Sequence, residues 1–218
     1  VEKALVKLGQ EVCVTRDRDR LLHADKVIVQ SENMRQIYIK EYLKSAKEQG
    51  MHVTVEELEE KILGLGSPKF DKAVNSQKED MQIPKEWMKL IQKADGSWKK
   101  IIFYNTSLAA FLQNSEQMLV KIKSALGTFK ESRDDVVLLW RPHPLMEETI
   151  TSMRPDLWEQ YQVIVDEYKE EGWGIYDDTS ELDRAIAISD AYYGDGSSVV
   201  QLYQKTGKPI MIQNVEIV

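Results

Sequence analysis

Residues 136–144 read VVLLWRPHP, an apolar run that ends abruptly in Arg141, Pro142, His143 and Pro144. An unbroken apolar run bounded by turn residues is typical of a strand buried on both faces, as in a parallel sheet. The two prolines restrict the backbone on either side of His143, so the imidazole is presented at a fixed place. The stretch therefore predicts an inner strand with a histidine held at its carboxyl end.

Short apolar runs alternate with amphipathic segments on both sides of this strand. Strands are predicted at residues 99–105, 136–140, 173–176, 190–194 and 209–213, and helices at 115–129, 155–171, 180–189 and 197–207. Five strands that alternate with helices imply right-handed crossovers and a Rossmann-like, doubly wound parallel sheet. We assign this α/β domain to residues 84–218.

Residues 1–75 carry a weaker form of the same pattern, which we interpret as an incomplete N-terminal α/β domain and crossover. The predicted elements are strands at 11–15 and 26–30, helices at 31–50 and 55–62, and a connector rich in Gly and Pro at 63–72. Ser31 is a suitable N-cap for the first helix, and Thr54 with Glu57 forms a capping-box signature for the second.

The composition is that of an ordinary globular protein, with 218 residues, 42% hydrophobic and 30% charged. No apolar stretch approaches the ~20 residues that span a bilayer. Cys13 is the only cysteine, so an internal disulfide is excluded and a cytoplasmic location is favoured.

The net charge of −7 is concentrated in the last third of the chain. Residues 1–150 hold 24 Lys and Arg against 23 Asp and Glu, whereas residues 151–218 hold 5 against 13. A long nucleic-acid polyanion would be attracted poorly to such a surface, so no nucleic-acid partner is expected. A small phosphate ligand is not excluded, because a few local donors are enough to hold it.

Ligands of open parallel sheets bind beyond the carboxyl ends of the strands. Polar residues gather there in this sequence, and we predict a substrate site formed by Asn105, Thr106, Ser107, Arg141, His143, Asp195, Gly196, Ser197 and Ser198.

The sequence GDGSS at residues 194–198 leads directly into a helix. Glycines permit a tight turn and close backbone approach, and the free N–H groups at a helix start form an anion site. A phosphate or pyrophosphate is the ligand expected at such a site. The alternative interpretation is that Ser197 is only an N-cap and the glycines only a turn.

Arg141 and His143 offer complementary chemistry at the end of the preceding strand. The guanidinium can form a fork to a phosphate or carboxylate, and the imidazole can donate to phosphate or act as an acid or base. Lys205 and Lys208 could add positive potential. The alternative here is a surface turn that holds a histidine by chance.

Taken together, the RPHP stretch, the DGSS helix start about 50 residues later and the following TGKPIMI resemble a known family. They are similar to the C-terminal nucleotide-binding domain of the CDP-glycerol glycerophosphotransferases of teichoic-acid synthesis, which are GT-B-type enzymes. GT-B sialyltransferases also pair such a histidine with two serines to hold CMP. The resemblance covers roughly residues 99–213, and ADKVIVQSENMRQIYI with LGLGSPKFD resembles the end of an N-terminal GT-B domain.

The resemblance implies a transferase that moves a glycerophosphate-type group from a CDP-alcohol to an acceptor hydroxyl in cell-wall or surface-polymer synthesis. It implies that His143 is catalytic and that Ser197 and Ser198 bind the pyrophosphate. The partners would be a nucleotide-linked donor and a polymer or lipid-linked acceptor. The location would be cytoplasmic, at the inner face of the membrane, with peripheral membrane association in the full-length protein. A further histidine is expected on the acceptor side, for which His23 and His52 remain.

No metal or other cofactor is expected, because the CDP-type donor is itself the substrate and no zinc-ligand spacing is present. Asp17 with Asp19, and Asp177 with Asp178, are the weaker candidates for a cation.

Two other functions remain open. A GT-B glycosyltransferase or epimerase using a CMP- or UDP-sugar would break a bond at sugar carbon, with Asp177 or Asp195 as the carboxylate. A non-catalytic remnant of the fold would bind a phosphorylated ligand or a partner protein, consistent with an incomplete N-terminal half.

Overall fold

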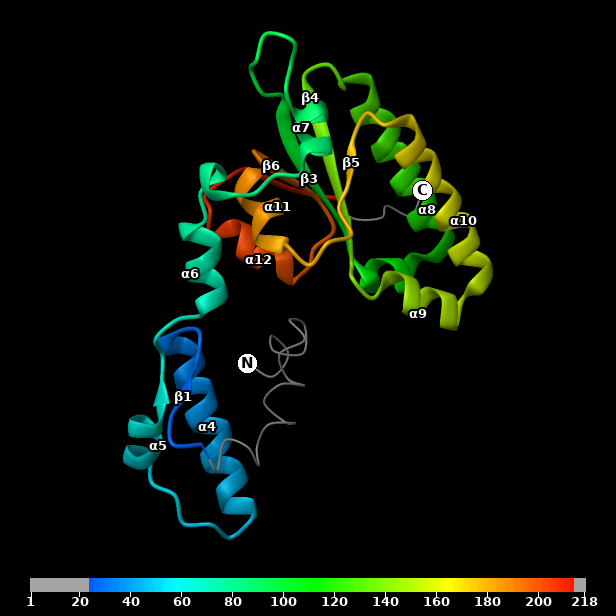
Figure 1. Cartoon of the computed structure of the whole chain (residues 1–218). Coiled ribbons are helices and arrows are strands. Elements are labelled where there is room, and N and C mark those ends of the chain that lie inside the picture. The colour runs from blue at the N-terminus through cyan, green and yellow to red at the C-terminus, as the bar shows by residue number, and fades with distance from the viewer. Residues whose placement is uncertain (1–23, 214–218) are drawn as a thin grey trace. The chain divides into compact units, whose positions relative to one another are not determined.

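The computed structural model describes residues 24–213, and the chain divides into two compact units, Val1–Asp71 and Lys72–Val218. Figure 1 shows the sheet of the second unit in the centre of its helices. The predicted strand at 11–15 lies outside the described residues, as do Cys13, Asp17, Asp19 and His23.

The first unit contains β1 (Val27–Ile28), α4 (Glu32–Glu48), α5 (Val55–Lys61) and β2 (Ile62–Leu63), and its two strands pair in parallel. Both predicted caps are confirmed. Ser31 accepts from the Met34 N–H, and Thr54 and Glu57 cap each other, with N···O distances of 2.9 and 3.2 Å. A small core stabilises the unit, formed by Val29, Ile39, Tyr42, Leu58 and Ile62.

The predicted connector at 63–72 is wrong in part. Ile62 and Leu63 pair with β1, and the Val29 N–H donates to the Leu63 carbonyl at 2.8 Å. Pro68 begins α6 (Pro68–Asn75), because a proline in the first helical turn loses no hydrogen bond. The glycine residues of this stretch lie between a strand and a helix, the proline begins that helix, and they do not form a long irregular linker.

The second unit continues with η1 (Lys78–Asp80), α7 (Lys85–Ile91), β3 (Lys100–Thr106), α8 (Leu108–Glu131), β4 (Val136–Pro142), α9 (Met146–Met153), α10 (Pro155–Glu171), β5 (Ile175–Tyr176), α11 (Leu182–Ile188), β6 (Ala191–Gly194), α12 (Ser198–Gln204) and β7 (Ile210–Ile212). The five strands β3–β7 form one parallel sheet, which confirms the predicted Rossmann-like α/β fold.

The strand order is β5-β4-β3-β6-β7. The chain steps outward from β3 to β4 and β5, crosses back to β6 on the other side of β3, and then proceeds to β7. The order therefore reverses between β3 and β6. In open α/β sheets the crevice at such a reversal, beyond the carboxyl ends of the strands, is where ligands bind.

Successive side chains of the inner strands pack on opposite faces of the sheet. Tyr104 and Trp140 contribute to the core under α8, α9 and α10, whereas Phe103 and Leu139 contribute to the core under α7, α11 and α12. Figure 1 shows these two sets of helices on the two sides of the sheet. Full burial of such side chains stabilises the fold by about 1.5–3 kcal/mol each.

Three helical segments differ from the sequence-based predictions. The helix α9 was not predicted, although Met146 and Ile150 bury one face of it at a helical spacing. The helix α8 begins at Leu108, earlier than the predicted residue 115, and its dihedral angles break at Ser115, where φ is 45°. The segment from the end of α6 through η1 and α7 was left unassigned.

Candidate functional site

Asn105, near the end of the central strand β3, joins the two loops that the sequence singled out. It was predicted as the last residue of the strand, and the structure places it within β3, 4% exposed. Its Nδ2 donates to the Arg141 carbonyl at 3.1 Å, and its Oδ1 accepts from the Ser197 Oγ at 3.1 Å. The end of β4, which leads to His143, and the loop after β6 are therefore held side by side across the strand reversal.

His143 is fixed by two backbone contacts. Its N–H donates to the Thr106 carbonyl at 3.0 Å, and its Nδ1 accepts from the Leu145 N–H at 3.1 Å. A ring nitrogen that accepts a hydrogen bond carries no hydrogen, so the neutral imidazole has its hydrogen on Nε2. The half-buried ring therefore presents Nε2–H as a donor.

Residues 195–198, here called the serine loop, begin α12. Gly194 has φ 137°, and a Cβ there would lie 2.2 Å from the Asn105 carbonyl oxygen, so only glycine allows this approach. Ser197 caps the helix by accepting from the Val199 N–H at 3.2 Å, and Ser198 is exposed. Within residues 24–213, the structure gives no protein acceptor to the N–H groups of Gly196, Ser197 and Ser198. Such a row of N–H groups favours an anion.

Asp195 lies beneath the serine loop and is 3% exposed. Its Oδ2 accepts from the Ser107 N–H at 2.6 Å, and its Oδ1 pairs with the Lys121 ammonium. Its own N–H donates to the Asn105 carbonyl at 3.0 Å. Protein donors occupy both carboxylate oxygens, so these contacts favour an anchoring role over contact with a substrate. Ser107 has a second structural role as the N-cap of α8.

Arg141 is also committed to protein partners. Its two terminal nitrogens donate to the Asp177 carboxylate at 2.6 Å and to the Thr179 carbonyl at 2.5 Å, and its side chain is 6% exposed. The Thr179 hydroxyl donates to Asp177 at 2.7 Å, and Arg184 lies 3.8 Å from the same carboxylate. This buried network ties the end of β4 to the loop after β5.

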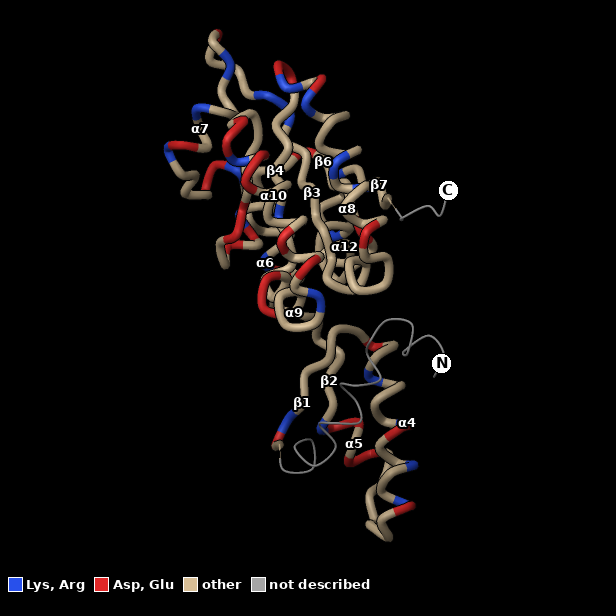
Figure 2. Tube along the Cα trace, turned by 90° about the vertical axis from the view of Figure 1, so that its right-hand side faces the viewer, with Lys and Arg blue, Asp and Glu red and all other residues tan. Residues whose placement is uncertain are grey.

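A cavity of about 530 Å³ opens beside His143, and we call it the His143 cavity. Its wall is formed by Arg141, Pro142, His143, Pro144, Met146, Glu147, Trp158, Gln162, Val165, Lys169, Tyr176, Asp177, Asp178 and Thr179. Its volume lies within the range of small-molecule sites. Burial raises the pKa of Tyr176 to about 12, so this phenol stays protonated at neutral pH. Figure 2 shows acidic residues on α9, which contributes Glu147 to the wall.

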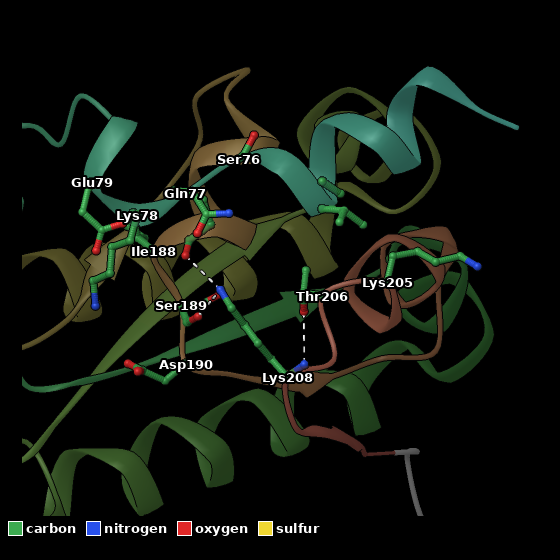
Figure 3. A pocket seen from close by; sticks show the side chains of 13 residues that line it. Ser76, Gln77, Lys78, Glu79, Ile188, Ser189, Asp190, Lys205, Thr206 and Lys208 are labelled. Carbon is green, nitrogen blue, oxygen red and sulfur yellow. Dashed lines mark hydrogen bonds between the residues drawn. The ribbon is translucent and has the colours of Figure 1, made fainter.

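A second cavity, of about 370 Å³, lies at the amino ends of β6 and β7 (Figure 3). The Lys208 ammonium there donates to the carbonyls of Ile186, Ala187 and Ser189 at 2.7–2.9 Å, and so caps the end of α11. The expectation that Lys208 adds positive potential at the substrate site is wrong, because its donors serve the opposite edge of the sheet. Lys205 lines this second cavity as well.

The residue that sequence reasoning missed is Lys121. Its signal was present in the predicted helix, because Lys121 falls beside Met118 and Ile122 on the stripe that faces the core. A lysine on a buried stripe needs a buried partner, and here the partner is Asp195. The His52 side chain is exposed in the first unit.

Residues 24–213 contain neither an assembled metal site nor a helix suited to a membrane. No group of three or more His, Cys, Asp or Glu side chains is arranged there to hold a metal ion. None of the helices in that part of the chain has the length and apolar character needed to cross a bilayer.

Comparisons with known proteins agree with this architecture. The family model for CDP-glycerol:poly(glycerophosphate) glycerophosphotransferase matches residues 4–217. A solved structure of the wall teichoic acid polymerase TagF, a His-to-Asn variant soaked with CDPG, matches 90% of this chain with a TM-score of 0.52 and 21% identity. This likeness confirms a GT-B-like fold, and the chain spans 41% of the length of that polymerase chain. No curated protein matches the sequence significantly.

Proposed function

The chain belongs to the CDP-glycerol:poly(glycerophosphate) glycerophosphotransferase family, and from this premise we propose that it transfers glycerophosphate from CDP-glycerol to an acceptor hydroxyl. The acceptor oxygen attacks the β-phosphorus and forms a new P–O bond. The bond from that phosphorus to the bridging oxygen breaks, and CMP leaves with the electron pair. The hydroxyl proton passes to a base.

The observation that carries this proposal is the junction at Asn105. One side-chain amide contacts the end of the strand that leads to His143 and the loop that leads into α12. Both loops offer hydrogen-bond donors, namely the Nε2–H of His143 and the N–H groups of the serine loop. Donors on the two loops that flank a strand reversal suit the pyrophosphate of a nucleotide donor.

We assign His143 the role of a donor to the phosphate of departing CMP. The Leu145 N–H donates to Nδ1, so the ring hydrogen is on Nε2. In this role the ring donates a hydrogen bond to the developing negative charge and does not take the proton from the attacking hydroxyl. Fixed donors of this kind need no reorganisation during the reaction. The base would come from the acceptor side, where the resemblance implies a histidine.

We place the cytidine in the His143 cavity. Trp158 and Tyr176 supply aromatic surface, and the Glu147 carboxylate can accept from the amino group of cytosine. Uracil has a carbonyl at that position and would face the carboxylate without a donor. This arrangement supports a preference for cytidine over uridine nucleotides.

The acceptor of the proposed reaction is a hydroxyl at the end of a glycerophosphate polymer or of its lipid-linked primer. The reaction would take place in the cytoplasm at the inner face of the membrane. Transfer at sugar carbon has less support, because the carboxylates it needs, those of Asp177 and Asp195, both lie in buried ion pairs.

The direct test is release of CMP. The chain is incubated with CDP-glycerol and a glycerophosphate oligomer, and CMP is quantified against a reaction without the oligomer. Acceptor-dependent CMP release supports the proposal. Binding of CDP-glycerol without CMP release would make the chain the donor-binding part of a longer enzyme. Release of UDP from UDP-GlcNAc, with no CMP released from CDP-glycerol, would favour the glycosyltransferase.

A further inference from the structure

Lys121 extends from α8 to the underside of the serine loop. Its ammonium pairs with Asp195 and donates to the Gln213 carbonyl just after β7. The side chains of Lys121 and Asp195 are 5% and 3% exposed, so water screens neither charge. This is a buried ion pair whose acidic member belongs to the same short loop as Ser197.

A buried carboxylate beneath an anion site opposes the binding of an anion. Asp195 is useful there, because it receives the Ser107 N–H and so anchors the loop to the start of α8. Its negative charge, however, lies two residues from Ser197, where the pyrophosphate is proposed to bind. Charges in a low-dielectric interior act strongly on one another, so an unpaired Asp195 would repel the donor.

We propose that Lys121 is a positioning residue that cancels the charge of Asp195, so that this carboxylate anchors the serine loop without repelling the donor pyrophosphate. This inference rests on the proposed function. Lys121 touches no substrate; it acts through Asp195. Its removal therefore weakens the binding of phosphorylated ligands and leaves the binding of an uncharged nucleoside unchanged.

Three variants test this role. Lys121→Met removes the compensating charge, and Lys121→Met with Asp195→Asn removes both charges while the Asn oxygen still accepts from Ser107. Lys123→Met changes an exposed lysine on the same helix and is the matched control. Neutral replacement of a whole buried pair is commonly tolerated, so the double variant is expected to fold even if the single variant does not.

Affinities for CDP and for cytidine are measured by calorimetry, after circular dichroism has confirmed folding. Lys121→Met should bind CDP at least about tenfold more weakly, and the double variant should return to within about threefold of the unaltered chain. Lys123→Met should bind CDP normally, and cytidine should bind all variants alike.

Each outcome decides the inference. Normal CDP binding by Lys121→Met, equal losses for CDP and cytidine, or a folded double variant that binds CDP at least about tenfold more weakly than the unaltered chain would overturn it. If Lys121→Met does not fold, normal CDP binding by the double variant supports it. If the unaltered chain binds no CDP, the proposed function fails and this inference fails with it.

Discussion

The two edges of the sheet in the second unit both carry cationic and hydroxyl groups, but they use them differently. At the amino edge, Lys208 donates to three carbonyls at the end of α11. At the carboxyl edge, backbone groups hold His143 and the Asn105 side chain holds the serine loop, while Nε2–H and several N–H groups remain available. Positive charge therefore does not by itself indicate a binding site. A better indication is a hydrogen-bond donor that the fold holds in place and that has no protein acceptor.

Replacement of His143 tests the carboxyl edge most severely. His143→Ala should lower the rate of CMP release by about 10²–10³, the usual effect of losing one donor to a developing negative charge. His143→Asn should retain part of the rate, because the amide still donates. The two variants are compared in kcat and KM, and a larger change in kcat than in KM is expected. An unchanged rate in His143→Ala would reduce the RPHP stretch to a turn.

Ser197→Ala should have the next largest effect. It removes a hydroxyl that caps α12 and contacts Asn105, and it should weaken nucleotide binding by about ten- to a hundredfold. Ser31→Ala is the matched control, because it removes an N-cap from α4 in the first unit. Both variants should lose about 1 kcal/mol of stability, but only Ser197→Ala should lose affinity in a calorimetric titration. Equal affinities would leave Ser197 as a cap alone.

Lys208→Met should affect stability and spare nucleotide affinity. Three carbonyls at the end of α11 lose their donor, at a cost of about 1–3 kcal/mol in urea unfolding. Burial lowers the pKa of Lys208, so the unfolded chain holds this proton more tightly. The unaltered chain should therefore gain stability relative to Lys208→Met as the pH rises through the lowered pKa toward 10.5. A large loss of nucleotide affinity would show that the two edges are coupled.

Chelation should have the smallest effect. We expect nucleotide binding to survive EDTA, because helix N–H groups and His143 neutralise the phosphates at the carboxyl edge. A calorimetric titration before and after EDTA measures this. Loss of binding that Mg²⁺ or Mn²⁺ restores would redirect attention to Asp17 and Asp19, or to Asp178, since Asp177 is paired with Arg141.

The sheet was predictable because each inner strand is an apolar run that ends in turn or polar residues. Pro155 and Gly172 similarly bounded α10 at both ends. The missed helix α9 is short, and the RPHP turn that precedes it read as a loop. Sequence periodicity is clearest in elements that span several turns, and the helices it missed, α6, α7 and α9, have only seven or eight residues.

The sequence predicted where the candidate site lies, but it did not predict which partners its polar side chains contact. Parallel strands bring their carboxyl ends to one edge, so Asn105, His143 and Ser197 could be grouped from the sequence. Which polar groups remain available depends on partners far along the chain. Arg141 pairs with Asp177, and Asp195 pairs with Lys121. The partners are 36 and 74 residues apart in the sequence, so no local pattern reveals either pair.

The most direct test of the account is a thermal unfolding titration of the unaltered chain and of His143→Ala with CDP, CDP-glycerol, CMP, UDP and UDP-GlcNAc. The cytidine nucleotides should raise the melting temperature of the unaltered chain more than the uridine nucleotides. A ligand at a hundred times its Kd adds about 2.7 kcal/mol to the stability, which is readily measured. The shift should shrink in His143→Ala. A chain that no cytidine nucleotide stabilises, or an equal shift in both proteins, would contradict the claim that His143 and the carboxyl edge bind a CDP-linked donor.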